Sequence, residues 1–332
     1  MGVSRFDDII GHAQVVDRLK KDMAGDRLSH AYLFVGPDGV GKNSVASLFG
    51  AAMLCAHADV EARPCGDCLA CGKIARFNHP DFHVLETEKG KKWIRIEQVR
   101  RLQTSMALRP FESERRVIVV DNADRMNEAA QNAFLKTLEE PPPGTLIIMV
   151  APGTQSLLPT IVSRCRIERF GPLKTEELSK ILVDKRGLDE NEANLIAGMV
   201  SGSVGAALAI DLDFVRKVKP AIIERIAEIA SEKKMNPEKV FGLSNQLTAI
   251  GDNSLEMIRM LLKDVAFMKM SRSGIINSDN SNAIEKLGKN MTMGKIFALF
   301  DKTLEAEMGL SRNLQKSFIF ENLLFAFAPG VP

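Results

Sequence analysis

The fold is decided by one stretch of sequence, Tyr32-Leu33-Phe34-Val35-Gly36-Pro37-Asp38-Gly39-Val40-Gly41-Lys42-Asn43. Its four leading residues are apolar and predict a short buried strand, and residues from about 42 to 54 predict a helix. A glycine-rich turn between a strand and a helix is the setting of a phosphate-binding loop. The glycines let successive backbone N–H groups point into one concavity, and the helix N-terminus adds positive potential. The residues expected to bind a nucleotide are Gly36, Gly39, Gly41, Lys42 and Asn43.

Two further apolar runs, Val117–Val120 and Leu146–Val150, also predict strands. Residues 127–140 lie between them and carry apolar side chains at helical spacing. Pro141-Pro142-Pro143 then ends that helix, because proline lacks the amide donor and disfavours a helix before it. Apolar strands separated by helices are typical of a parallel sheet covered on both faces. The first half of the chain is therefore expected to be an α/β core.

Two residues of the expected nucleotide site depart from what hydrolysis requires. Asn43 stands where the motif has Ser or Thr, whose hydroxyl binds Mg²⁺, so we expect weak or absent metal binding there. Asp121 ends the second strand and could hold Mg²⁺ through water, but the next residue, Asn122, cannot take a proton from an attacking water. We expect a site that holds ATP or ADP without hydrolysing it. The alternative is a glycine-rich turn with no ligand.

Several motifs together resemble the AAA+ subunits of bacterial clamp loaders. They are Phe6-Asp7-Asp8-Ile9-Ile10-Gly11-His12, Asn132-Ala133-Phe134-Leu135-Lys136-Thr137-Leu138-Glu139-Glu140-Pro141-Pro142 and Ser163-Arg164-Cys165. The resemblance covers roughly residues 5 to 210. It implies a RecA-like AAA+ core over 1–170, a small helical lid over 171–211 and a helical collar for oligomerisation over 212–332. It also implies a hetero-oligomer of DNA polymerase III that acts in DNA replication. The partners would be the gamma/tau and delta subunits, the sliding clamp and primer-template DNA.

The second half of the chain fits this layout, because no convincing strand follows Phe170. Thr175 precedes two acidic residues, which is typical of a helix start. Residues 314–327 predict a final apolar helix, and the Ser- and Asn-rich stretch Ser271–Asn282 predicts a loop. A further helix is indicated by an apolar stripe at helical spacing, formed by Leu255, Ile258, Leu262 and Val265.

The family contains motor subunits (gamma/tau), which have a complete ATP site, and a non-motor kind whose site is incomplete. Besides Asn43 and Asn122, Gly205 departs from the motor pattern, because the motor subunit has an arginine there. The resemblance therefore favours a non-motor subunit with little or no ATPase activity of its own. One alternative is an active motor of the same fold. Another, from a different class, is a zinc-dependent nucleic-acid-binding module with a vestigial phosphate loop.

Arg164 is the candidate catalytic residue. A guanidinium is planar and permanently charged, and it suits a γ-phosphate on which charge is spreading. An isolated arginine is more often a surface residue paired with an acid. The Ser-Arg-Cys context, through the family resemblance, instead implies an arginine finger that serves ATP bound to a neighbouring subunit.

Four of the five cysteines lie close together, and the fifth, Cys165, stands alone. Their spacing is C-x9-C-x2-C-x2-C, and four thiolates can close a tetrahedral zinc site with no open position, which makes such a site structural. Gly66 supplies a permissive backbone between two of them. His57 is an alternative ligand, and four reduced cysteines or a disulfide are the alternatives to a metal. The expected ligands are Cys55, Cys65, Cys68 and Cys71.

The amino-acid composition excludes two classes of nucleic-acid-binding protein. Lys and Arg number 44 against 42 for Asp and Glu, so a protein that coats nucleic acid by bulk charge is excluded. One Trp and one Tyr are too few for a platform that stacks single strands. Lys89-Gly90-Lys91-Lys92 could touch DNA, although a solvated hairpin tip is the simpler interpretation. No apolar run reaches the roughly 18 residues of a membrane span, and Met1–Asp8 lacks the pattern of a signal peptide, so we expect a cytoplasmic protein.

Overall fold

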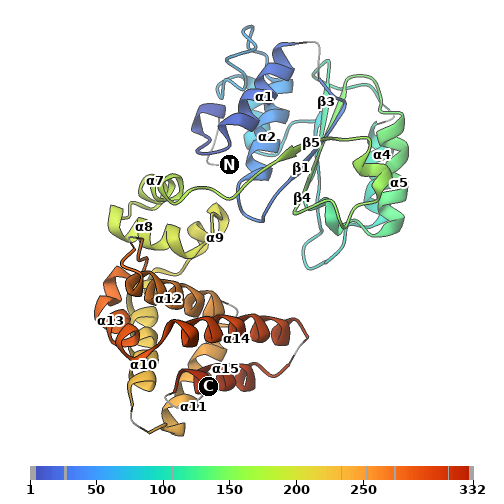
Figure 1. Cartoon of the computed structure of the whole chain (residues 1–332). Helices are drawn as coiled ribbons and strands as arrows, with labels where there is room; N and C mark the ends of the chain where they lie inside the picture. The colour runs from blue at the N-terminus through green and yellow to red at the C-terminus, as the bar shows by residue number, and fades with distance from the viewer. Residues whose placement is uncertain are drawn as a thin grey trace. The chain divides into compact units, whose positions relative to one another are not determined.

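A computed structural model of the chain describes residues 5–25, 28–106, 108–232, 234–251, 253–272, 274–312 and 314–328 (Figure 1). The chain divides into two compact units. The first contains the described residues up to Ile181 together with Ser201–Ala206. The second contains Leu182–Val200 and the described residues from Ala207 onward. The division falls within two helices, α7 (Thr175–Arg186) and α9 (Val204–Ala209).

The first unit is built on a five-stranded parallel sheet with the strand order β2-β3-β4-β1-β5. The three central strands are buried along their whole length, as expected for β-branched and other apolar residues with helices on both faces. The three strands expected from sequence are therefore confirmed. The bounds are β1 (Ala31–Val35), β2 (Phe82–Leu85), β3 (Arg116–Val120), β4 (Thr145–Ala151) and β5 (Arg166–Arg169).

Helices cover both faces of this sheet (Figure 1). On one side lie α1 (Ala13–Ala24) and α2 (Lys42–Leu54), and on the other lie α4 (Ile96–Met106) and α5 (Glu128–Glu139). Two shorter helices, α3 (Leu69–Ala75) and α6 (Pro159–Val162), complete the unit. The second face is sealed by a continuous apolar core that includes Leu33, Ile118, Met126, Phe134 and Ile147.

The ends of α5 follow the sequence rules. The Asn127 side chain caps its start by accepting a hydrogen bond from the Ala130 N–H at 2.8 Å. The helix stops at Glu139, two residues before the proline run that begins at Pro141. The expected helix over 127–140 is therefore confirmed to within a residue at each end.

The two edge strands, β2 and β5, are absent from the sequence-based expectations. Each has only four residues, and polar side chains such as His83, Arg166 and Glu168 interrupt the apolar pattern. These segments form strands because each pairs with a central strand of the sheet: β2 pairs with β3, and β5 pairs with β1. Such tertiary pairing overrides a weak local signal.

The second unit is helical, and beyond Arg169 the described part of the chain contains no strand. The predicted stripe on α12 is confirmed, since Leu255, Ile258, Leu262 and Val265 are all buried. Packed helix pairs include α11 with α15, and α12 with α13 and α14. The bounds are α8 (Glu190–Met199), α10 (Lys219–Ser231), α11 (Pro237–Ile250), α12 (Asn253–Lys269), α13 (Ser281–Asn290), α14 (Met293–Ser311) and α15 (Lys316–Phe327).

A buried polar network crosses this second unit. The Lys219 ammonium is fully buried, and it donates to the Asn277 side-chain oxygen at 3.0 Å and to Asp279 at 2.9 Å. Asp264 is also fully buried and accepts hydrogen bonds from the backbone N–H groups of Ile276 and Asn277. The network fixes most of the stretch expected to be a loop, although α13 begins within that stretch, at Ser281.

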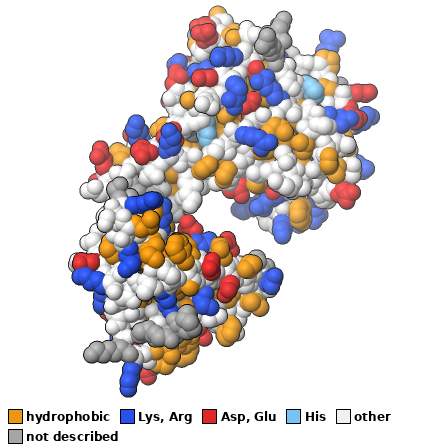
Figure 2. Space-filling view, viewed as in Figure 1, with side chains coloured by type: hydrophobic (Ala, Val, Ile, Leu, Met, Phe, Trp, Pro, Cys, Tyr) orange, Lys and Arg blue, Asp and Glu red, His pale blue; other side chains and the backbone are white. Residues whose placement is uncertain are grey.

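The visible face of the molecule carries interspersed positive and negative side chains, in agreement with the small net charge of +2 (Figure 2). Along the described residues, no helix combines the length and apolar character that a membrane crossing requires.

Candidate functional site

The phosphate loop follows β1 and leads into α2, as expected, but its lysine is turned inward. The Lys42 ammonium donates to the backbone carbonyls of Gly36 and Pro37, both at 2.6 Å, and lies 3.7 Å from an Asp38 carboxylate oxygen. Its side chain is only 6% exposed. Burial lowers the pKa of Lys42, opposed by the nearby carboxylates of Asp38 and Asp121. The group that would bind outer phosphates is thus held by the loop itself.

A second segment of the same unit packs onto this loop. The Gly205 N–H donates to the Gly39 carbonyl at 2.9 Å. Gly39 has a left-handed backbone (φ +74°), and a side chain there would collide with the Ser203 hydroxyl. A side chain at position 205 would begin 3.2 Å from the Gly39 Cα. Two facing glycines therefore permit a backbone approach that larger residues would prevent.

The metal side of the site is also occupied by internal contacts. The Asn43 side-chain amide donates to one oxygen of Asp121 at 3.0 Å, and the Asn122 N–H donates to the other at 3.0 Å. Burial raises the pKa of Asp121, an effect that the Asn122 hydrogen bond opposes. The structure thus brings together all the residues predicted for the nucleotide site. It also shows Asn43 and Asp121 bonded to each other.

His12, in the segment that resembles the adenine-flanking motif, borders the loop. Its Nε2 lies 2.8 Å from the Val40 carbonyl oxygen, and its ring packs edge-on against Phe170 with centroids 4.9 Å apart. These contacts attach the N-terminal segment to the phosphate loop. The segment that contains His12 therefore lies next to the phosphate loop, as its resemblance to an adenine-flanking segment leads one to expect.

Arg164 lies beside the end of the strands that is opposite to the phosphate loop. It follows α6 and comes two residues before the start of β5, whereas the phosphate loop follows the end of β1. Because β1 and β5 are parallel, with Tyr32 opposite Arg166 and Val35 opposite Arg169, these positions lie at opposite ends of the strands. At about 3.3 Å per residue, the strand alone separates them by roughly 10 Å.

The Arg164 side chain is partly exposed and is held by its own chain. One terminal nitrogen lies 2.7 Å from an Oε1 atom of Glu139, and the other donates to the Thr160 carbonyl at 2.9 Å. The side chains of Arg164 and Glu139 are 35% and 48% exposed. The guanidinium is therefore within reach of solvent and of another protein.

Gln131, which the sequence interpretation missed, fixes the backbone that leads to Arg164. It is buried in α5, donates to the carbonyls of Met126 and Ser156, and accepts from the Leu158 N–H at 2.8 Å. The loop ahead of α6 is thereby attached to α5. The only sequence signal for this role is a polar residue at a position that helical spacing places on the buried face.

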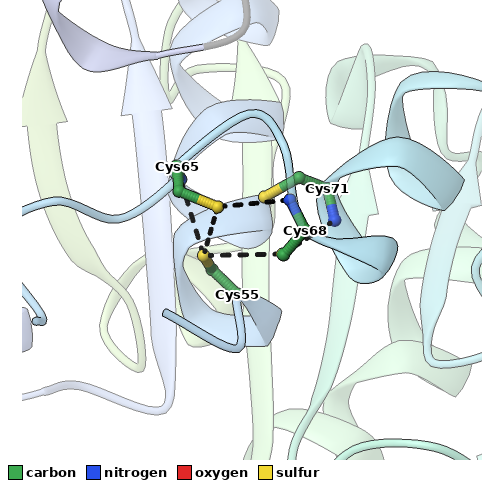
Figure 3. Close-up of side chains that lie close together, drawn as sticks. All are labelled: Cys55, Cys65, Cys68 and Cys71. Atoms are coloured by element: carbon green, nitrogen blue, oxygen red, sulfur yellow. Dashed lines mark hydrogen bonds between the residues drawn. The ribbon is translucent and has the colours of Figure 1, made fainter. Parts of the chain in front are cut away.

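The four predicted cysteine ligands converge, and their sulfur atoms point toward one another (Figure 3). All four sulfurs lie within 4.8 Å of one another. Cys55 Sγ is 3.6 Å from that of Cys65 and 3.8 Å from that of Cys68, too far for a disulfide. Four thiolates about 2.3 Å from a tetrahedral Zn²⁺ lie about 3.8 Å apart, so the cluster fits an ion of this kind.

Backbone hydrogen bonds lower the pKa of two of the four thiols, Cys65 and Cys68, whereas burial raises the pKa of Cys55 and Cys71. The N–H groups of Cys68 and Cys71 donate to the preceding cysteine sulfurs at 3.4 and 3.5 Å. Burial raises the pKa of Cys68, but the backbone and side-chain hydrogen bonds outweigh it and lower that pKa to about 6. Gly66 supplies the left-handed turn (φ +85°) between Cys65 and Cys68. His57, the alternative ligand, is exposed and hydrogen-bonds within its own turn.

The cysteine module is joined to the sheet. The Lys73 ammonium of α3 lies 2.5 Å from Glu112, and the N–H of Glu112 donates to Asp81 at 2.8 Å. Asp81 also accepts from the N–H groups of Phe111 and Ser113. Burial raises the pKa of Asp81, but these three hydrogen bonds more than offset it, so the pKa is lowered. By contrast, Lys89, Lys91 and Lys92 are exposed, with Lys92 over the Trp93 ring.

Two family models match the chain. The model described as DNA polymerase III, delta subunit, matches residues 11–174. A second model, which describes the C-terminal part of the DNA polymerase III delta subunit, matches residues 222–328.

Individual relatives span most of the chain. A DNA polymerase III subunit delta' from Pseudomonas aeruginosa is 30% identical over 312 residues, covering 91% of this chain and 93% of that protein. A subunit of the same name from Bacillus subtilis is 26% identical and covers 96% of both chains. A tau/gamma subunit from Haemophilus influenzae is 35% identical over 177 residues, which is 53% of this chain and 25% of that protein. A gamma subunit-related structure from Thermotoga maritima covers 94% of this chain at 19% identity, with a TM-score of 0.45.

Proposed function

The chain belongs to the family of DNA polymerase III delta' subunits. We propose that it is a non-motor component of the clamp loader and that it lends Arg164 to ATP bound on a neighbouring subunit. In this proposal its partners are the gamma/tau and delta subunits. The assembled loader places the sliding clamp on primer-template DNA during replication, in the cytoplasm.

The observation that carries this proposal is the position of Arg164 relative to its own phosphate loop. The two lie at opposite ends of parallel strands, and the guanidinium contacts Glu139 and Thr160 instead of its own phosphate loop. A cation at that end of the strands is suited to complete a nucleotide site on another chain. A guanidinium that stabilises the charge of a transferring phosphoryl group increases the rate by about 10³–10⁵ in GTPases.

The chain's own nucleotide site is proposed to be idle in hydrolysis. Lys42 is satisfied by loop carbonyls, and Asp121 is engaged by Asn43. Asn122 cannot act as a base toward water. A nucleotide that enters this loop must displace the Lys42 contacts first, and it then finds weak magnesium ligation and no proton acceptor next to Asp121.

We further propose that the cysteine cluster of Cys55, Cys65, Cys68 and Cys71 holds a structural zinc ion. The four sulfurs would fill all four positions of a tetrahedral ion, which would leave no open site for catalysis. Less than one zinc per chain in purified protein would argue against it.

The proposed collar over 212–332 has a surface suited to assembly. Phe297, Leu304 and Met308 share one face of α14 and are each more than half exposed. The spacing of seven and four residues keeps them on one side of the helix. Phe318 on α15 adds another exposed ring. We retain the division into core (1–170), lid (171–211) and collar as part of this proposal.

The test is ATP turnover by a loader reconstituted with the motor and delta subunits, with clamp and primed DNA present. Omission of this chain, or Arg164→Ala, is expected to depress turnover while the isolated Arg164→Ala chain keeps its folded structure. Arg169→Ala, which removes an exposed arginine from the other end of β5, serves as the matched control. Unchanged turnover with Arg164→Ala would refute the finger. Brisk, Lys42-dependent hydrolysis by the isolated chain would instead indicate a motor.

A further inference from the structure

Both terminal nitrogens of Arg164 are engaged by its own chain. One meets the Glu139 carboxylate at 2.7 Å and the other donates to the Thr160 carbonyl at 2.9 Å. These are the same donors that a guanidinium offers to a phosphate oxygen. Each terminal nitrogen carries two N–H groups, so these contacts occupy two of the five donors of the guanidinium and compete with a neighbouring phosphate for them.

Glu139 occupies an unfavourable place for a carboxylate unless a cation is near. It is the last residue of α5, and a helix C-terminus carries negative potential that disfavours an acid. The Arg164 guanidinium supplies the compensating charge. The pair forms because α5 packs against α6, whose end leads directly to Arg164.

The backbone on both sides of the contact is fixed, so the side chains alone can change partner. Gln131 binds the loop before α6 to α5, and Arg166, two residues after Arg164, meets the buried Asp22 at 2.8 Å. A change of partner by Arg164 thus needs only side-chain rotation. Exposed rotamers of this kind interconvert fast compared with turnover of an ATPase.

We propose that Glu139 is a positioning residue that retains Arg164 on its own chain and competes with the neighbour's nucleotide for the guanidinium. This inference rests on the proposed role of Arg164 as an arginine finger. When the neighbouring site is empty, Glu139 holds the guanidinium. When a triphosphate fills that site, its greater charge draws Arg164 across the interface. Glu139 then opposes nucleotide engagement without touching the nucleotide.

Competition of this kind has a defined kinetic signature. Exposed ion pairs hold their partners weakly, so removal of the Glu139 charge is expected to lower the ATP concentration for half-maximal turnover by about two- to five-fold. The maximal turnover changes little, because Arg164 is engaged in both proteins once ATP saturates. The difference shrinks at high salt, which screens the exposed pair.

The experiment compares Glu139→Gln with Glu140→Gln in the reconstituted loader, measuring turnover against ATP concentration with clamp and primed DNA. Glu140 is the adjacent exposed carboxylate, so its variant makes the same change in net charge. We expect a lower half-maximal ATP concentration for Glu139→Gln alone. We also expect no effect of Glu139→Gln when Arg164 is replaced by alanine.

An unchanged or higher half-maximal ATP concentration for Glu139→Gln would overturn the inference. An equal effect of Glu140→Gln would also overturn it, because the effect would then come from net charge. Failure of the finger proposal is separate, since it would appear as normal turnover by the Arg164→Ala loader. If turnover depended on Arg164 but Glu139→Gln left the half-maximal ATP concentration unchanged, only the inference about Glu139 would be wrong.

Discussion

Two cations of the first unit, Lys42 and Arg164, are held in opposite ways. Lys42 is buried, and the carbonyls of its own loop surround its ammonium. Arg164 is partly exposed, and one exposed carboxylate and one carbonyl hold it. Lys42, which belongs to the phosphate-loop motif, makes its contacts within its own loop. Arg164, whose sequence motif is weaker, is available to another protein.

This contrast separates stability from activity. Contacts of a buried ammonium contribute to folding, because their loss leaves polar groups unsatisfied away from water. An exposed ion pair contributes little to folding and is easily exchanged for another partner. Lys42 should therefore matter to the folded state of the isolated chain. Arg164 should matter to the assembled loader.

The largest expected effect comes from the proposed zinc site, which adjoins α2, the helix that follows the phosphate loop, and not the α5 and α6 region that holds Arg164. Cys55 directly follows α2, the helix that begins at Lys42. Zinc binding contributes about 10–16 kcal/mol to isolated zinc modules, and Cys71→Ser is expected to cost several kcal/mol here, because the sheet supports the module. Hydrogen exchange should accelerate at the end of α2 and stay unchanged in α5 and α6.

Cys165→Ser provides the control for that experiment. Cys165 lies beside Met149 rather than in the cluster, so its variant should keep its zinc and its exchange pattern. If Cys71→Ser accelerated hydrogen exchange equally in α2, α5 and α6, the helix of the phosphate loop would not differ from the region that holds Arg164. That result would mean that the cysteine cluster supports the whole core.

The next effect is the loss of Lys42. Lys42→Met leaves the Gly36 and Pro37 carbonyls without their donor, so we expect a loss of about 1–3 kcal/mol in urea unfolding of the isolated chain. Turnover by the reconstituted loader should stay within two-fold of the wild type. Arg164→Ala should show the reverse, with an unfolding change under about 1 kcal/mol. A collapse of turnover with Lys42→Met would show that the chain's own phosphate loop contributes to the cycle.

The sequence predicts those features of the fold and the sites that depend on residues close together in the chain. The central strands and α2 follow from uninterrupted apolar runs and a glycine-rich turn, and the cysteine cluster follows from spacing alone. The missed strands β2 and β5 are short and partly polar, so only pairing with β3 and β1 defines them.

The orientation of the charged groups depends on contacts between distant residues. Gly205 meets Gly39 across more than 160 positions, and Asn43 meets Asp121 across 78. Glu139 and Arg164 are 25 residues apart and meet only because α5 packs on α6. No local pattern encodes these pairs. The sequence therefore predicts which residues form the sites but not which of them bind one another.

The smallest expected effect tests whether the metal side of the phosphate loop is idle. Burial raises the pKa of Asp121, so the folded state binds its proton more tightly than the unfolded state does. The contribution of this group to stability is therefore greatest below the unfolded pKa, near 3.9, and is lost as pH rises through the folded pKa. At neutral pH the ionised carboxylate is a net cost. Asp121→Asn should then raise the free energy of unfolding by up to about 1 kcal/mol at pH 7.

That gain should disappear on acidification, because protonated aspartate and asparagine carry the same charge. Urea unfolding of both proteins at a series of pH values measures it, and loader turnover should be unaffected. Asp17→Asn is the control, since it removes an exposed carboxylate of the same unit that does not influence the pKa of Asp121. A loader that slows with Asp121→Asn would contradict the comparison, because a carboxylate whose removal costs activity is still holding a metal ion or a water for chemistry. If Asp121→Asn raised the free energy of unfolding without lowering turnover, Asp121 would destabilise the folded chain and have no role in turnover, although it stands where the sequence predicts a metal ligand.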